Sequence, residues 1–146
     1  MADLFHKTAA DLAEDARQLL NELDREVPGV ANINAECRPP LDVLERTSTV
    51  EVVVDIPGVP ADSLRVVIRR NTLLIVGAKP PTPAGTDVRF HLAERAYGRF
   101  ARAVRLSGAF DASRARATTE AGQMRIVLPR MEDRRGRLYT VPVDSE

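Results

Sequence analysis

The most restrictive feature of this sequence is a set of short segments in which apolar residues occupy every second position. In the segment 49–56 valine or isoleucine stands at each even position, and the segment 123–128 repeats this alternation at positions 124, 126 and 128. Side chains along a β-strand point alternately to opposite faces, so a period of two predicts strands with one buried face.

Further segments extend this pattern and are separated by residues that favour turns. Segments 64–68 and 100–106 carry apolar residues at one parity, and 73–76 is apolar on both faces, which predicts a central strand. The predicted turns and loop are Pro57-Gly58, Asn71-Thr72, Ala121-Gly122 and the proline-rich segment 79–87. Several short strands without a helical period predict an all-β fold, an antiparallel β-sandwich whose connections the periodicity does not fix.

A second pattern separates an N-terminal arm, residues 1–38, from the β domain at 39–130 and a tail at 131–146. Between residues 5 and 23 apolar side chains recur every three or four positions, which predicts an amphipathic helix that ends near Pro28-Gly29; a linker at 30–40 follows. This stripe can cover the β domain, pair between chains or bind another molecule, and packing or self-association is favoured over a client surface. We call this set the apolar stripe: Phe5, Leu12, Leu19 and Leu23.

Composition argues against several classes of partner. Twenty-one basic residues balance twenty-one acidic ones, and aromatic residues make up only 4% of the chain, so we expect no nucleic-acid site. No apolar run reaches the ~20 residues of a membrane helix. Because the start of the chain is also too acidic for a signal peptide, we expect no membrane partner and a cytoplasmic protein. The single cysteine, Cys37, is expected to be a half-exposed free thiol.

Residues with catalytic or ligating chemistry are scattered. His6 on the predicted helix and His91 at the expected start of a strand have no cysteine or carboxylate cluster at metal-ligand spacing. The serines lie outside nucleophile motifs, and the sequence holds none of the glycine-rich loops that bind phosphates. We therefore expect a protein that is not an enzyme and that works without a metal, a cofactor or ATP.

An ordered set of motifs resembles the α-crystallin domain of small heat-shock proteins. The run 94–100 is similar to the family's E-R-x-x-G-x-F motif, and 117–129 to its A-x-x-x-x-G-x-L-x-I-x-L-P motif. Upstream, 41–43 and 54–59 resemble its D-V and D-x-P-G-x elements, so the similarity covers residues 39–130. The resemblance implies an immunoglobulin-like sandwich with a helical arm and a flexible tail. It also implies an ATP-independent holdase that binds partly unfolded proteins and prevents their aggregation under stress.

A dimer interface is the first site that follows. Arg102 shares the parity of Phe100 and Val104, and a charge on an apolar face must be paired. It matches the family's arginine at the subunit interface, which implies an ion pair between subunits. In bacterial and plant relatives a loop segment pairs with the partner's first strand, which here implies these interface residues: Asp87, Val88, Arg89, Phe90, Leu41 and Val43.

The tail carries the second site. Pro142 holds an extended backbone, so Val141 and Val143 point to the same side. This is similar to the family's I/V-x-I/V motif, which docks into a groove on a neighbouring subunit. The groove expected here, called the tail groove, is bounded by the strands that carry Val66, Ile68, Ala115 and Ala117. The expected partners are therefore further copies of the chain, as a homodimer and a higher homo-oligomer, and partly unfolded clients.

Two other classes of function stay open. Co-chaperones of the p23/CS type share the sandwich and bind a folded partner, but they lack a V-x-V tail and a helical arm. Truncation of both ends without loss of function would favour that class. An enzyme on this scaffold would need a substrate-sized pocket lined by convergent polar groups.

Overall fold

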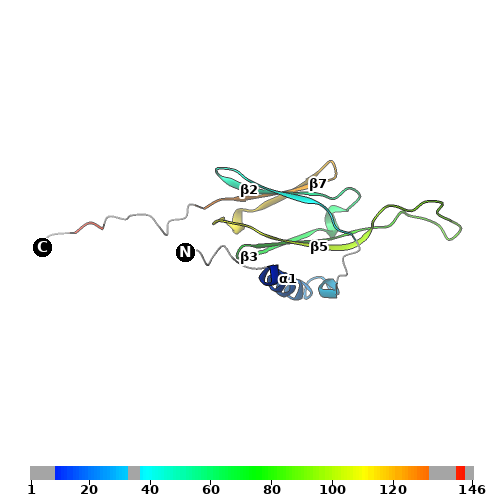
Figure 1. Ribbon diagram of the computed structural model, residues 1–146, viewed down its shortest axis with the longest axis horizontal. Helices are drawn as coiled ribbons and strands as arrows, with labels where there is room; N and C mark the ends of the chain where they lie inside the picture. The colour runs from blue at the N-terminus through cyan, green and yellow to red at the C-terminus, as the bar shows by residue number, and fades with distance from the viewer. Residues whose placement is uncertain (1–8, 33–36, 132–140, 144–146) are drawn as a thin grey trace.

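The computed structural model describes residues 9–32, 37–131 and 141–143. Two antiparallel sheets pack face to face, and one helix lies against the outer side of the sheet that contains β3 and β5 (Figure 1). The four-stranded sheet has the order β1-β2-β7-β6, with the bounds β1 Leu41–Glu45, β2 Thr49–Asp55, β7 Gln123–Pro129 and β6 Arg116–Glu120. The three-stranded sheet has the order β3-β4-β5, with the bounds β3 Arg65–Arg69, β4 Thr72–Lys79 and β5 Gly98–Arg105. The predicted antiparallel β-sandwich is confirmed.

Helical structure is confined to one helix and three short turns among the described residues. The helix α1 spans Ala9–Leu23, and Gly29, with a φ of 86°, takes the left-handed conformation that turns the chain after it. The 3₁₀ turns are η2 Val30–Asn32, η3 Ala61–Ser63 and η4 Ala112–Arg114. The helix ends at Leu23, five residues before the Pro28-Gly29 pair near which its end was predicted. Residues 5–8 of the predicted helix lie outside the described part of the chain.

The main core lies between the two sheets and consists of the residues that the alternation predicts. On β2 and β7 the buried positions are the even ones, and the odd positions are more exposed. The three-stranded sheet contributes Leu73, Ile75 and Phe100 from the opposite side. Burial of this apolar surface is the dominant stabilising contribution to the fold.

β4 is covered on both of its faces. Its inward residues Leu73 and Ile75 belong to the main core, while Leu74 and Val76 point outward and pack beneath α1. The prediction of a central strand at 73–76 is therefore confirmed. α1 supplies the cover that the second apolar face requires, so among the described residues the helix packs on its own β domain.

Two turns show how well local chemistry predicts the connections. The β6–β7 hairpin turns at Ala121 and Gly122, with φ angles of 51° and 77°, as predicted. The β3–β4 turn is one residue earlier than predicted, at Arg70-Asn71, where Arg70 has a φ of 54°. The prediction was wrong because Thr72 is a fully buried strand residue, which its polarity conceals.

The structure also corrects three smaller expectations. The predicted linker at 30–40 begins with η2, and its Val30 is buried beneath α1. Cys37 is only 9% exposed and packs in the main core, so it is not a half-exposed thiol. His91 lies in the connection between β4 and β5 and does not start a strand. Burial of Val30 and Cys37 follows from their apolar side chains, which the proline-rich surroundings obscure.

Candidate interaction surfaces

The apolar stripe is the first surface, and its described members face the three-stranded sheet. Leu19 and Leu23 are buried against Leu74 and Val76, and Leu12 is half-buried. Phe5, the fourth member, lies outside the described residues. The stripe is therefore occupied in this structure by the chain's own sheet, which is one of the three alternatives that its periodicity allows.

Two acidic residues of α1 also bind the three-stranded sheet through polar contacts. Asp15 Oδ2 accepts hydrogen bonds from Thr72 Oγ1 at 3.1 Å and from Arg105 Nη2 at 2.7 Å. Near the helix C-terminus Glu22 forms an ion pair with Arg69 on β3. Sequence reasoning missed Asp15, although its position supplies a signal. It lies three residues after Leu12 and four before Leu19, within the apolar stripe, where a carboxylate requires a partner.

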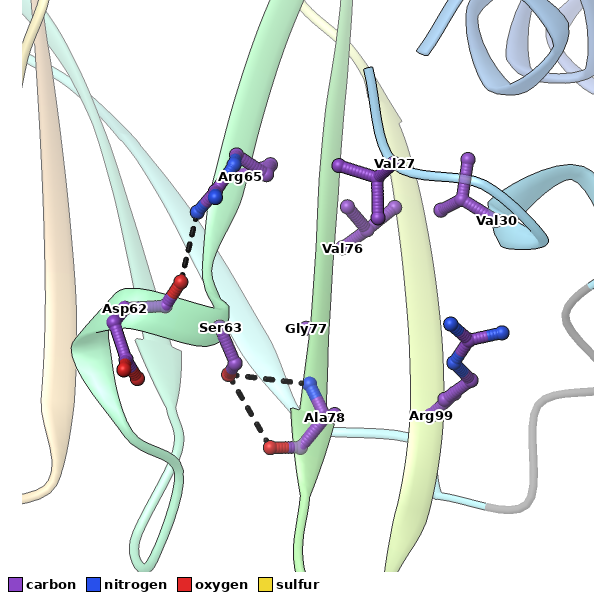
Figure 2. Close-up of a pocket in the computed structure, with 9 residues that line it drawn as sticks. All are labelled: Val27, Val30, Asp62, Ser63, Arg65, Val76, Gly77, Ala78 and Arg99. Atoms are coloured by element: carbon purple, nitrogen blue, oxygen red, sulfur yellow. Dashed lines mark hydrogen bonds between the residues drawn. The ribbon is translucent and has the colours of Figure 1, made fainter. Parts of the chain in front are cut away.

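A pocket opens where the segment after α1 crosses the end of β4 (Figure 2). Its cavity of about 240 Å³ is lined by Val27, Val30, Asp62, Ser63, Arg65, Val76, Gly77, Ala78 and Arg99. The Ser63 hydroxyl is bound to the backbone of Ala78, at 3.3 Å from both its carbonyl oxygen and its nitrogen. The lining holds no histidine, and the Ser63 hydroxyl is bound to backbone groups, so no nucleophile activated by a histidine occurs in this pocket. The pocket offers apolar contacts and two arginines, Arg65 and Arg99, rather than a catalytic constellation.

The residues of the predicted tail groove come from edge strands of the two sheets. Val66 and Ile68 on β3 and Ala115 just before β6 are half-buried and pack against the main core. Ala117 on β6 is exposed. The two valines of the tail motif are also exposed, Val141 by 77% and Val143 by 94%. Within the described residues, the tail motif and part of the predicted groove lining are therefore exposed.

The predicted dimer residues lie on an edge strand and on a projecting connection. β1 is the outermost strand of its sheet, and Val43 on it is 43% exposed, while Leu41 packs partly against the core. The connection from β4 to β5 extends beyond the end of the sandwich (Figure 1) and carries Phe90, which is 60% exposed. Its other predicted residues, Asp87, Val88 and Arg89, are exposed as well. Sequence reasoning missed three further exposed apolar residues on these elements, namely Leu44, Leu92 and Tyr97.

Arg102 lies mid-way along β5 and is half-buried. Its Nη1 donates a hydrogen bond to the carbonyl oxygen of Pro39 at 2.5 Å. Burial, and after it the nearby Arg38 guanidinium, lower the pKa of Arg102 below its ordinary value. Among the described residues no carboxylate forms an ion pair with this side chain. The environment within one chain thus disfavours the charge that Arg102 carries.

The sequence matches the model of the Hsp20/alpha crystallin family over residues 42–143, which includes every strand from β2 to β7 and the tail motif. The chain belongs to this family. Family members, the small heat-shock proteins, are chaperones that form homo-oligomers and bind client proteins. Membership of the family accounts for the ordered set of α-crystallin motifs in this sequence.

Individual small heat-shock proteins agree with this assignment. Small heat shock protein C4 of Rickettsia felis is 30% identical over 99 residues, a match that covers 68% of this chain and 61% of that protein. The structure of heat shock protein 16.0 from Schizosaccharomyces pombe matches with a TM-score of 0.63 and 27% identity, over 75% of this chain and all of that one. A small heat-shock protein from Xylella fastidiosa, described as having a distinct high order structure, matches with a TM-score of 0.60 and 25% identity, over 77% of this chain and 97% of that one.

Within residues 9–32, 37–131 and 141–143, no three histidine, cysteine or acidic side chains gather as metal ligands would. Over the same ranges, no helix has the length and apolar character needed to cross a membrane.

Proposed function

We propose that this small heat-shock protein is an ATP-independent holdase, which binds partly unfolded proteins and prevents their aggregation. The observation that carries the proposal is the placement of apolar side chains in a chain of this family. They are exposed on an edge strand, on the β4–β5 connection and in the tail motif. Surfaces of this kind serve association with other polypeptides. No phosphate-binding loop occurs in the sequence, so we propose that binding is independent of nucleotide.

The proposed assembly begins with a homodimer. β1 presents an edge that can add a strand from the partner's β4–β5 connection, through residues 87–90. Pro80, Pro81 and Pro83 cannot donate ladder hydrogen bonds, which limits pairing to the end of this connection. The half-buried Arg102 supports the same interface, because an acidic group of the partner would relieve the cost of burying its charge.

The tail extends the proposed dimer to a higher homo-oligomer. Val141 and Val143 would insert between β3 and β6 of another subunit, where Val66, Ile68 and Ala115 are half-buried. Burial of two valines contributes at most about 3–5 kcal/mol before the tail is ordered, so each contact is weak and reversible. We place this assembly in the cytoplasm, which suits a chain with a single free cysteine.

The test of the proposed function is aggregation of a thermolabile enzyme followed by light scattering. At an equal number of subunits and without nucleotide, the full chain is expected to suppress scattering, and an inert protein at the same mass is the control. If the chain is oligomeric yet leaves scattering unchanged, the holdase proposal is wrong. Full suppression by a variant that lacks residues 1–38 and 131–146 would favour the co-chaperone class instead.

A further inference from the structure

The outer face of the three-stranded sheet has an apolar centre and basic corners. Leu74 and Val76 on β4 form the centre, with Val67, Ala101 and Ala103 around them. Arginines stand at the periphery, one near the end of β3 and two at opposite ends of β5: Arg69, Arg99 and Arg105. An apolar patch ringed by guanidinium groups is complementary to an amphipathic segment that carries acidic side chains.

Each of these arginines is bound by α1 or by the segment that follows it. Arg105 pairs with Asp15, and Arg69 pairs with Glu22. Arg99 lies beside Val30 (Figure 2) and donates to the carbonyl oxygen of Gly29 at 3.2 Å. The helix therefore meets the face through its apolar stripe and through its charges together.

The composition of α1 fits this face better than it fits an isolated helix. It carries four acidic residues and one arginine, and no basic residue in its last turn. Glu22 stands near the helix C-terminus, where a negative charge opposes the helix dipole. Arg69 on the sheet compensates for this placement. A helix of 15 residues is also marginal in water, so α1 depends on the sheet that it covers.

We propose that the outer face of the β3-β4-β5 sheet is a binding site for acidic amphipathic helices, occupied within the chain by α1 and, when α1 is released, by such a helix of a client. The inference rests on the proposed holdase function and adds the class of client segment. Two buried leucines and two partly exposed ion pairs hold α1, so a segment of the same chemistry can compete with it.

The experiment uses the full-length chain with α1 released. The released variant, Asp15→Asn, Leu19→Gln and Glu22→Gln, removes both ion pairs of α1 and one of its two buried leucines, and it changes no residue of the sheet. The matched control, Glu14→Gln with Glu26→Gln, changes the charge equally at exposed positions without a contact to the sheet. The probe is a fluorescent peptide with the sequence of residues 8–26, and a second peptide has lysine in place of every acidic residue. Binding is measured by fluorescence anisotropy, and circular dichroism verifies the fold of each variant.

The released variant is expected to bind the acidic peptide about tenfold more tightly than the lysine peptide, because two charge pairs are gained in one case and two repulsions in the other. Arg69→Gln with Arg105→Gln in the released variant should abolish this preference, and the control variant should bind both peptides weakly. Equal affinity for the two peptides would overturn the proposal.

If the released variant does not fold, the wild-type chain carries the test. The acidic peptide with a photoreactive group at the position of Leu12 is then expected to crosslink to β4 or β5, and crosslinks confined to other elements would overturn the proposal. The light-scattering assay separates the two ideas. A chain that suppresses aggregation without a charge preference retains the holdase function and loses this inference, whereas a chain that does not suppress aggregation loses the holdase function itself.

Discussion

At Gly77 the ring of Phe100 occupies the space that a side chain would need. Gly77 stands opposite Phe100 in the β4–β5 register, and a Cβ atom added to it would lie 2.6 Å from Cζ of Phe100 and 3.0 Å from Cδ2 of Leu64. The ring thus covers the bare backbone of the neighbouring strand. Parity predicts that Phe100 faces inward, but it does not give the register that pairs the ring with a glycine.

Gly77→Ala is expected to destabilise the sandwich by about 1–3 kcal/mol, because the added methyl group overpacks a core with no space for it. The measurement is the urea unfolding midpoint. Gly85→Ala, in the exposed β4–β5 connection, is the control and should leave the midpoint unchanged. Equal midpoints for both variants would show that the Phe100 ring moves aside at little cost.

Arg102→Ala is expected to weaken the proposed dimer. Removal of one partner from a buried ion pair costs roughly 3–5 kcal/mol, since the acidic group of the other subunit is left without its counter-charge. Native mass as a function of protein concentration measures this loss, with Arg25→Ala on the exposed surface as the control. A native mass and melting temperature identical to those of the wild-type chain would contradict the intersubunit pair.

At the scale of elements, the strands that bury an apolar face were predictable and the position of the helix was not. The period of two at 49–56 and 123–128 places β2 and β7 within a residue of their observed bounds. The apolar stripe predicts α1 but suits the sheet, a second chain or a client equally well. The contact that decides between these, Asp15 with Arg105, joins residues 90 positions apart, a separation that no local pattern encodes.

Leu19→Ala is expected to loosen α1 and to accelerate tryptic cleavage after Arg25 about tenfold or more. Loss of a buried leucine side chain costs about 2–3 kcal/mol, and the open form of the helix becomes more populated by the corresponding factor. Leu44→Ala, on the exposed side of β1, is the control. If both variants are cleaved at the wild-type rate, the contact between α1 and β4 does not protect this site.

At the scale of the whole molecule, the sequence predicts the sandwich but not the topology of its strands. Periodicity identifies strands with a buried face, but any order of strands that buries those faces satisfies it, so the β1-β2-β7-β6 and β3-β4-β5 orders needed the structure. The contacts proposed for assembly could not be predicted from residue patterns either, because each of them joins two chains. The tail groove, the β1 edge and Arg102 each require a second chain, and the family resemblance rather than residue chemistry suggested how they are paired.

Changing Val141 and Val143 to glycine is expected to shift the assembly toward dimers and to leave the sandwich folded. The tail groove loses the two side chains that would fill it, while both valines lie outside the core. Size-exclusion chromatography with light scattering gives the mass, and circular dichroism verifies the β content. Met131→Gly, also exposed, is the control. An unchanged elution volume for the double variant would contradict docking by the tail.

The double-sided burial of β4 has a consequence for synthesis on the ribosome. Residues 72–77 are all buried, and an unfolded chain would present this run as a segment prone to intermolecular pairing. α1 precedes β4 in the sequence, so the helix that covers its outer face is already made when β4 leaves the ribosome, whereas β5 and β7 follow. During translation α1 is therefore available to cover the outer face of β4, the most apolar strand, before the chain can contact another subunit.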